Sequence, residues 1–246
     1  MIEVSDLHKT FGENRVLRGV SLRVEKGKTF VILGGSGSGK TVLMKHVIGL
    51  LKPDQGSVRV GGVDISALSG KELTEARRMF GMVFQKSALF DSMTVLENVA
   101  FPLRERDRRL AAKELRKRVV EKLRVVDLSE SVLPLYPSEL SGGMQKRVAL
   151  ARALIHEPPV VLYDEPTTGL DPITTEYVDE MIVHAKERLG VTSMVISHDI
   201  ASSFRVADQL AVLYDGAIAA QGTPDEVRRS EHPHVKKFLS LWFEKQ

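Results

Sequence analysis

The spacing of apolar residues divides the chain into a β-rich beginning and a later alternation of strands and helices. Residues 2–7, 15–24 and 56–65 are short, rich in β-branched residues and nearly alternating in polarity, which is typical of half-buried strands. Residues 29–33, TFVIL, are instead an unbroken apolar run followed by glycines and a helical pattern. Such a run indicates a strand buried on both faces of an α/β sheet.

The same buried-strand signal returns at residues 160–164 (VVLYD), 193–197 (SMVIS) and 209–216 (QLAVLYDG). Residues 95–156 differ, because their apolar residues recur at helical spacings of three to five on a charged background. The pattern therefore predicts a helical lobe inserted into an α/β core.

The tail of the chain carries one more amphipathic segment. In residues 232–246 a helix would place Phe238, Leu241 and Trp242 on one face. We expect this helix to fold back on the domain, and docking onto a second subunit is the alternative.

Composition narrows the class of protein. A chain of 246 residues with 43% apolar content is long enough for a large core, and no run approaches the roughly 18 apolar residues of a membrane-spanning helix. The first residues lack the charged-then-apolar order of a signal peptide, which favours a protein that stays where it is made. The absence of cysteine excludes disulfides, thiolate metal sites and thiol nucleophiles.

The positive charge is concentrated in one segment. Residues 104–124 contain ten lysines and arginines against four acidic residues, a balance of +6, whereas the whole chain has a net charge of +3. This segment is interpreted either as a solvated helix face or as a docking face for anionic lipid or a partner.

The clearest chemical motif is GGSGSGKT, which matches the P-loop pattern G-x-x-x-x-G-K-[ST] between a buried strand and a helical stretch. Glycines let backbone N–H groups surround phosphates, and the start of the helix adds positive potential. In this motif the lysine reaches the outer phosphates and the threonine can ligate Mg²⁺. The predicted phosphate-binding residues are Gly34, Gly35, Ser36, Gly37, Ser38, Gly39, Lys40 and Thr41.

Four polar residues follow the buried strands and complete a hydrolytic site. Asp164 is predicted to hold the Mg²⁺ shell, and Glu165, one residue farther out, to activate the attacking water. Gln85 ends an apolar strand, and its amide can reach the metal or the water. His198 ends another strand and is placed to hydrogen-bond the γ-phosphate, although a histidine in this place can also be structural. The other histidines have no metal-site spacing, so the expected cofactors are ATP and the Mg²⁺ that it brings.

With LSGGMQKR at residues 140–147, these motifs resemble the ATPase subunit of an ABC transporter. GGSGSGKT is similar to the Walker A motif, Gln85 to the Q-loop residue and LSGGM to the ABC signature. VVLYDE is similar to Walker B, TTGLD to the D-loop and His198 to the switch histidine. The motifs cover residues 1–225 in the order and at the spacings of the family.

The resemblance implies an α/β fold of the P-loop NTPase class. The ABC ATPase has a RecA-like mixed sheet core, an N-terminal antiparallel β subdomain and an inserted helical subdomain. A single domain would span residues 1–246. Its core would comprise residues 1–85 and 157–225, its helical subdomain residues 86–156 and its helical tail residues 226–246.

The resemblance also implies a head-to-tail homodimer with each ATP between the P-loop of one copy and the signature of the other. Ser141 and the backbone N–H groups of Gly142 and Gly143 would contact the γ-phosphate bound by the other copy. Met144 departs from the glutamine that most family members have in this place. A methionine cannot make the polar contact that a glutamine side chain could make in this place. The serine and the two glycines of the signature are present.

Two further residues take their roles from the resemblance. Phe11 falls where the family places an aromatic ring against adenine, with a core position in the β layer as the alternative. Asp171, in the D-loop, would communicate across the dimer.

Several longer sequence segments are most similar to those of Mla-type ATPases, which drive phospholipid or intermembrane lipid transport between inner and outer membranes. They include SALFDSMTVLENVAFPLRE and ELSGGMQKRVALARAL. This implies integral membrane permease subunits, an MCE-type lipid-binding protein and a place on the cytoplasmic face of the inner membrane. Residues 86–101 would contact the permease.

Two alternatives remain from the sequence. The transporter can instead serve an amino acid, a metal or a lipoprotein, because an ATP site makes the same contacts whatever the cargo. A soluble ABC ATPase in DNA repair or translation would explain the basic segment. One P-loop, no cysteine and no long insertion argue against it, so no nucleic acid is expected as a partner.

Overall fold

The computed structural model describes residues 1–107 and 109–243, the last three of these by their backbone alone. The strands are β1 (Ile2–Phe11), β2 (Asn14–Val24), β3 (Thr29–Leu33), β4 (Gln55–Val60), β5 (Val63–Asp64), β6 (Phe80–Val83), β7 (Val160–Asp164), β8 (Thr192–Ser197), β9 (Gln209–Tyr214) and β10 (Ala217–Gly222). The α-helices are α1 (Lys40–Val47), α2 (Gly70–Ala76), α3 (Val95–Arg106), α4 (Ala112–Val125), α5 (Gly142–Leu154), α6 (Pro172–Leu189), α7 (Ile200–Val206), α8 (Pro224–Arg228) and α9 (Pro233–Phe243).

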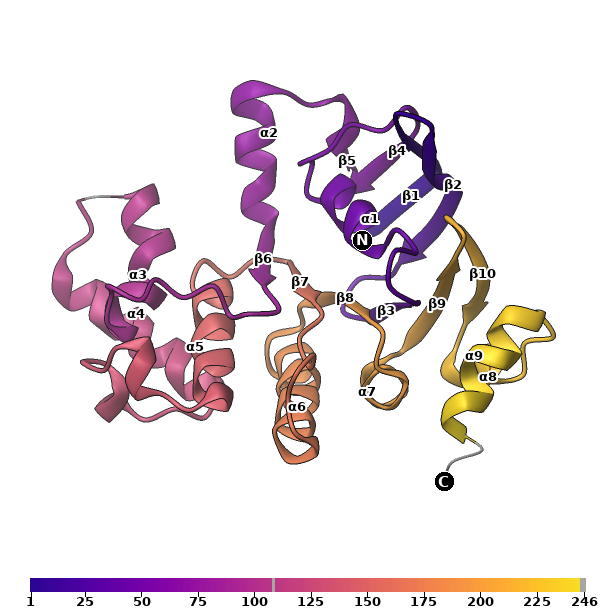
Figure 1. The fold of residues 1–246 in the computed structure, drawn as a ribbon. Coiled ribbons are helices and arrows are strands. Elements are labelled where there is room, and N and C mark those ends of the chain that lie inside the picture. The colour runs from indigo at the N-terminus through magenta and orange to yellow at the C-terminus, as the bar shows by residue number, and fades with distance from the viewer. Residues whose placement is uncertain (108, 244–246) are drawn as a thin grey trace.

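The strands form two sheets, and Figure 1 shows the helices α3, α4 and α5 set apart to one side of them. The smaller sheet is antiparallel with the order β2-β1-β4-β5. The larger sheet has the order β10-β9-β3-β8-β7-β6, in which β10 pairs antiparallel with β9 and the other neighbours are parallel. A mixed sheet beside an antiparallel one confirms the predicted fold class.

Alternate residues of the buried strands face two separate hydrophobic clusters. In β3, Phe30 and Ile32 belong to the cluster shared with the small sheet and α1, whereas Val31 and Leu33 belong to the cluster that includes α3, α4 and α5. The same alternation holds in β7 and β8. Because successive side chains point to opposite faces, a strand that is covered on both faces carries apolar residues at successive positions rather than at every second one.

The helices α3, α4 and α5 pack on one another where the sequence predicts a helical lobe (Figure 1). The hydroxyl of Thr94 accepts the backbone N–H of Glu97, and the Glu97 carboxylate accepts that of Thr94. This capping box fixes the start of α3 by satisfying N–H groups that have no partner inside the helix. Leu115, Val119 and Leu123 of α4 are buried, as their helical spacing predicts.

Two boundaries differ from the sequence pattern. The pattern predicts one strand over residues 56–65, but β4 and β5 are separated by a turn at Gly61 and Gly62. Their φ angles of 58° and 87° lie in the left-handed region, which favours glycine. The helical pattern after the P-loop, VLMKHVIGLL, extends over residues 42–51, but α1 ends at Val47, shortly before Gly49 with its φ of 67°.

The tail packs against the domain through α9. Val235 and Leu239 are buried in the cluster that includes the helical lobe, and the ring of His234 stacks on Tyr214 with 3.5 Å between ring centroids. Of the three residues predicted to share a face, Phe238 packs against this cluster. The side chains of Leu241 and Trp242 lie outside the described part of the chain.

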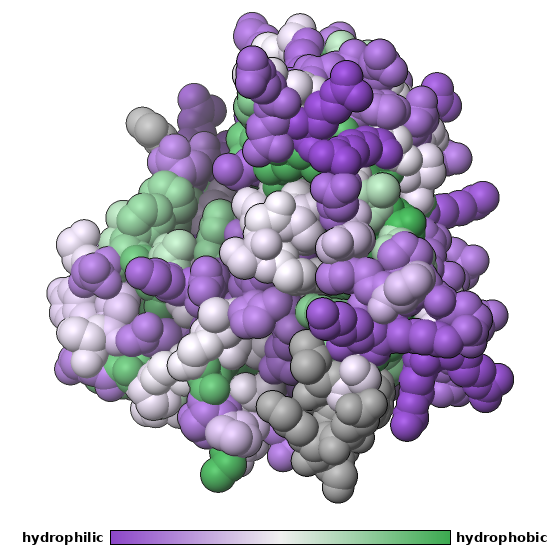
Figure 2. Space-filling model, turned by 45° about the vertical axis from the view of Figure 1, so that its right-hand side comes forward, coloured by the Kyte–Doolittle hydropathy of each residue, from purple (hydrophilic) through white to green (hydrophobic). Residues whose placement is uncertain are grey.

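Most large apolar side chains are inside the two clusters. Figure 2 shows a largely hydrophilic face on which hydrophobic residues gather in limited patches. Within the described residues, none of the helices combines the length and the apolar character needed to cross a bilayer.

Asp179 links the long helix α6 to α7. Its side chain is inaccessible to solvent, and it accepts hydrogen bonds from the Ser202 hydroxyl and, at 3.0 Å, from the Arg205 guanidinium. Burial raises the pKa of Asp179 to about 6, although both donors oppose the shift.

We expect Asp179→Asn to change how stability depends on pH. A carboxyl whose pKa is raised by folding stays protonated in the folded state after the unfolded chain has released its proton. Its contribution is therefore fully present below the unfolded pKa and is lost as pH rises through about 6. Relative to the asparagine variant, the wild-type free energy of unfolding should fall by about 2 kcal/mol between pH 4.5 and 7.5.

Urea unfolding at the two pH values measures this difference. Asp225→Asn makes the same substitution at an exposed aspartate and serves as the control. A flat difference for Asp179→Asn would show that burial does not govern this carboxyl.

Candidate functional site

The loop between β3 and α1 holds the residues predicted to surround phosphate. It spans residues 34–39 and enters α1 at Lys40. Gly39 precedes the helix with a φ of 105°, and a Cβ on Gly34 would lie 2.5 Å from the carbonyl oxygen of Leu213. The backbone conformation and the close approach of β9 therefore require glycine at these two positions. The loop lies at the carboxyl end of a parallel strand, ahead of a helix N-terminus that favours anions.

Lys40 crosses this loop. Its side chain is 7% exposed, and its Nζ donates to the carbonyl oxygens of Gly34 at 2.8 Å and Gly35 at 3.0 Å. The hydroxyl of Ser38 is buried and finds no hydrogen-bond partner among the described residues. Thr41 is exposed. The loop and the first turn of α1 thus bring together the Lys40 ammonium, the buried Ser38 hydroxyl and the exposed Thr41.

Glu165 brings the end of β7 to this loop. Its carboxylate is 16% exposed and lies 3.5 Å from Lys40 Nζ. His198 Nδ1 donates to the same carboxylate at 2.6 Å, and the Thr168 hydroxyl donates to it at 2.9 Å. Glu165 has a φ of 50°, which is uncommon for a residue with a side chain and points to a locally constrained backbone. Three residues predicted from separate motifs, Lys40, Glu165 and His198, therefore meet.

Asp164, the last residue of β7, is half-buried beside this cluster. Burial raises its pKa, and the negative charge of Glu165 raises it further. A carboxyl in such surroundings becomes a stable anion when a cation lies next to it. Within the described residues, no group of three or more histidines or carboxylates is arranged to hold a metal ion.

Gln85 follows β6 and is exposed. Its carbonyl oxygen accepts a hydrogen bond from the buried ammonium of Lys146 in α5. The structure does not join its side chain to Lys40 or Glu165 through any hydrogen bond among the described residues.

The residues of LSGGM lie at the start of α5, where Ser141 and Gly142 are exposed and Leu140 is buried. Ser141 is exposed, and its hydroxyl caps the helix by accepting the Met144 N–H at 3.3 Å. A Cβ built on Gly142 would meet nothing within 4 Å, so the fold of one chain does not itself require glycine there. Met144 packs against the hydrophobic cluster of the lobe, which explains why an apolar residue suits this position.

Phe11 and Asp171 make no hydrogen bond to Lys40 among the described residues. Phe11, at the end of β1, is 45% exposed, with the Lys9 ammonium 5.5 Å from its ring centroid. It is therefore not a core residue of the β layer. Asp171 caps α6, since its carboxylate accepts the backbone N–H groups of Ile173 and Thr174. The Thr174 hydroxyl also donates to this carboxylate and contributes most to holding the pKa of Asp171 below its usual value. The two backbone N–H groups lower the pKa further.

A groove of about 400 Å³ lies between β6 and α3. Phe84, Phe90 and Phe101 contribute aromatic rings to it, and the ring centroids of the last two are 4.8 Å apart. Phe84 and Phe90 are about 40% exposed. Arg152 and His156 supply its polar wall. The groove is apolar, open and formed in part by residues 86–101.

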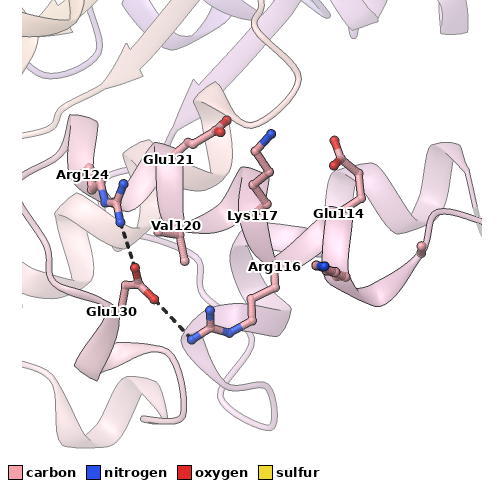
Figure 3. Close-up of a pocket in the computed structure, with 9 residues that line it drawn as sticks. Glu114, Arg116, Lys117, Val120, Glu121, Arg124 and Glu130 are labelled. Carbon is pink, nitrogen blue, oxygen red and sulfur yellow. Dashed lines mark hydrogen bonds and ion pairs between the residues drawn. The ribbon is translucent and has the colours of Figure 1, made fainter.

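The basic segment forms a separate pocket of about 620 Å³ along α4 (Figure 3). In Figure 3 the Arg116 and Arg124 guanidinium groups bracket Glu130, with ion-pair distances of 3.3 and 2.9 Å. Four cations and three carboxylates line this pocket, so its own excess charge is small. Arg108 lies outside the described residues.

Three residues near the site make contacts that the sequence motifs do not predict. Thr168 belongs to TTGLD, but nothing in the spacing indicates its bond to Glu165. In the sequence, Lys146 and Arg152 look like residues of the polar face of a helix. In the structure both are buried, and they donate to backbone carbonyl groups more than sixty residues away. A lysine or arginine among the small residues of α5 is the only signal that the sequence offers.

The similarity to known proteins extends over most of the chain. The profile of the family described as "ABC transporter" matches residues 17–168. The dimeric structure of a post-hydrolysis state of the ATP-binding cassette MJ0796, bound to ADP and Pi, has a TM-score of 0.81 and 35% identity. The match covers 91% of this chain and 99% of that one.

Curated relatives have different named cargoes. The "Intermembrane phospholipid transport system ATP-binding protein MlaF" of Haemophilus influenzae is 41% identical over 97% of this chain and 90% of its own length. The "Methionine import ATP-binding protein MetN 1" of Bacillus cereus is 42% identical over 99% of this chain and 71% of its own. The "Probable ribonucleotide transport ATP-binding protein mkl" of Mycobacterium leprae is 40% identical over 97% and 68%, respectively.

Proposed function

The chain belongs to the ABC transporter family, and from this premise we propose how its residues use ATP and what its transporter moves. It is an ATP-binding subunit that hydrolyses ATP to power transport, and cassettes of this family dimerise and work with membrane permease components. The proposal concerns the roles of individual residues, the cargo and the accessory partners.

The meeting of Lys40, Glu165 and His198 at the P-loop is the observation that carries the catalytic proposal. Lys40 neutralises the outer phosphates, and Glu165 accepts a proton from the attacking water. His198 donates to Glu165 through Nδ1, and when its Nε2 also carries a proton, that N–H can donate to the γ-phosphate. The backbone N–H groups of residues 34–39 surround the phosphates, and the exposed ring of Phe11 lies against adenine.

The residues present fit Mg²⁺ bound together with ATP. Hydroxyl and carboxylate oxygens are the ligands that Mg²⁺ prefers, and Thr41 and Asp164 supply them. The amide oxygen of Gln85 would be a third ligand from the protein. When bound, the ion supplies charge stabilisation to the phosphates. Burial and the negative charge of Glu165 raise the pKa of Asp164, and a cation bound beside it would lower that pKa.

The signature residues serve a second copy of the chain. Ser141 and the N–H groups of Gly142 and Gly143 form a helix N-terminus that faces solvent, with open space around Gly142. Such an end binds anions, and glycine allows close approach. We assign these residues to the γ-phosphate of the other copy in a head-to-tail homodimer, with Asp171 as the link across it. ATP then closes the dimer and hydrolysis releases it.

We propose phospholipid as the cargo, moved between the inner and outer membranes from the cytoplasmic face of the inner membrane. The partners are integral permease subunits and an MCE-type lipid-binding protein. The similarity to MlaF supports this, since it extends over 90% of that protein's length. Mla-type phrases around the helical lobe and the signature support it too. Within the chain, the proposal divides a core (1–85 and 157–225) from a helical subdomain (86–156) and a tail (226–246).

The cargo is tested by purifying the chain with its native membrane partners. Mass spectrometry should identify a permease and an MCE-type protein, and solvent extraction should recover phospholipid. A permease without an MCE partner and without lipid would favour transport of an amino acid, a metal or a lipoprotein instead.

The aromatic groove is proposed as the permease site, and Phe90→Glu tests it. Phe90 is 40% exposed, whereas Leu89 packs against the lobe, so a charge at Phe90 changes the groove with less disturbance of the core. A carboxylate in an apolar contact loses its hydration, which should weaken permease association by about tenfold or more. Transport should be lost while ATP binding is kept.

Pull-down of the permease and nucleotide affinity measure the two effects. Leu50→Glu, at an exposed apolar residue after α1, is the matched control and should retain transport. Normal transport by the Phe90→Glu complex would remove the groove from the proposal.

A further inference from the structure

Two buried cations of α5 hold the segment of residues 85–88, which follows β6. Lys146 is 4% exposed and donates to the carbonyl oxygen of Gln85. Arg152 is 9% exposed, and its guanidinium donates to the carbonyl oxygens of Ser87 at 2.8 Å and Ala88 at 2.7 Å. One helix therefore binds three carbonyl groups of this segment.

These cations have no carboxylate partner among the described residues. Burial alone lowers the pKa of Lys146 and of Arg152, with no nearby charge contributing. A desolvated cation needs strong acceptors, and charge-assisted hydrogen bonds to carbonyl oxygens provide them. The cost of burying both charges is thus offset by their contacts with this one segment.

The segment itself has an unusual backbone. Ser87 and Ala88 have φ angles of 58° and 47°, which residues with side chains seldom adopt. Such a conformation persists where the surroundings fix it. The forked guanidinium of Arg152, bonded to two successive carbonyl groups, is the contact that can do so.

Arg152 also reaches the aromatic groove. Its guanidinium carbon lies 5.9 Å from the Phe90 ring centroid, and its side chain lines the groove beside Ala88. The same helix begins beside Ser141, about 16 Å away along its axis at 1.5 Å per residue. A rigid element therefore joins the groove, the Gln85 segment and the signature.

We propose that Lys146 and Arg152 are positioning residues that lock residues 85–88 onto α5, so that filling the groove moves Gln85 and Ser141 as one unit. The proposal rests on the proposed function, which assigns the groove to the permease and Ser141 to the nucleotide of the other copy. The lock itself can be measured in the isolated chain.

The first test follows the mobility of the segment. The chain has no cysteine, so Lys86→Cys, at an exposed residue, carries a single spin label. The label should be immobilised in the otherwise wild-type chain and mobile with Arg152→Met, which keeps an apolar stem and removes the donors. Arg152→Lys should restore part of the immobilisation. The control is Lys122→Met, which removes an equally buried cation of α4 that pairs with Glu157.

The second test measures coupling in the complex purified with its membrane partners, in vesicles of phosphatidylethanolamine and phosphatidylglycerol. Its readout is the ratio of the ATPase rate of the complex to that of the isolated chain. Arg152→Met should lower this ratio by about tenfold, with the KM for ATP within about twofold of wild type. Lys122→Met should leave the ratio unchanged.

Each outcome decides between the lock and its alternatives. An immobile label in Arg152→Met, or a mobile label with an unchanged ratio, would overturn the proposal. Failure of the proposed function looks different, because Phe90→Glu would then leave permease binding intact while the label still responded to Arg152→Met.

Discussion

Replacing Ser141 with arginine is expected to abolish ATP hydrolysis, whereas replacing Met144 with glutamine leaves the rate within a few fold of wild type. Ser141 is exposed at the open end of α5, beside a glycine with free space around it. A long cationic side chain there would fill the space that the other copy's phosphates need. The loss should be about 100-fold or more, as when a preorganised donor at a reacting charge is removed.

Met144 should behave differently because its side chain packs against the lobe. Glutamine has nearly the same length and keeps the helix, so the main cost is a partly buried amide, about 1 kcal/mol of stability. Steady-state ATPase rates measure both variants. Nucleotide affinity of the monomer is the control and should be unchanged in both, since the P-loop is intact. An equal loss of rate in the two variants would contradict the assigned roles.

Replacing Glu165 with glutamine should stop hydrolysis while ATP still binds. The amide retains the size of the carboxylate and can accept from His198 and Thr168, but it cannot take a proton from water. Loss of a general base lowers the rate by about 10²–10⁴-fold. Because ATP then persists, a dimer should accumulate, which gel filtration with light scattering detects.

Glu157→Gln is the matched control for this variant. Glu157 precedes β7 as Glu165 follows it, also has a left-handed φ of 56°, and pairs with Lys122 away from the P-loop. It should hydrolyse ATP at close to the wild-type rate. Near-normal hydrolysis by Glu165→Gln would show that another group activates the water.

Local patterns predicted much of this fold because they report local burial. The runs TFVIL and VVLYD become β3 and β7, since a strand covered on both faces is buried along nearly its whole length and carries mostly apolar residues. The meeting of Lys40, Glu165 and His198 follows from the topology, in which β3, β7 and β8 run parallel and end at one edge.

Contacts that depend on how a helix packs against a distant segment could not be predicted in this way. The bonds of Arg152 to Ser87 and Ala88 depend on how α5 lies against the end of β6, which no periodicity encodes. Whether Phe11 is exposed or buried could not be predicted for the same reason. A β-rich pattern does not show which aromatic rings are covered when another part of the chain packs on the sheet. The half-site at Ser141 was accessible only through its motif, since its proposed ligand belongs to another copy.

Each ATP site is proposed to be built from two copies of the chain, and mixing two inactive variants tests this arrangement directly. Lys40→Ala should disable the P-loop half and Ser141→Arg the signature half, so neither should hydrolyse ATP alone. In a mixed dimer, the intact P-loop of one variant faces the intact signature of the other. The mixture should recover up to about a quarter of the wild-type rate, because half of randomly formed dimers are mixed and each has one complete site. A mixture no more active than its separate components would contradict the account.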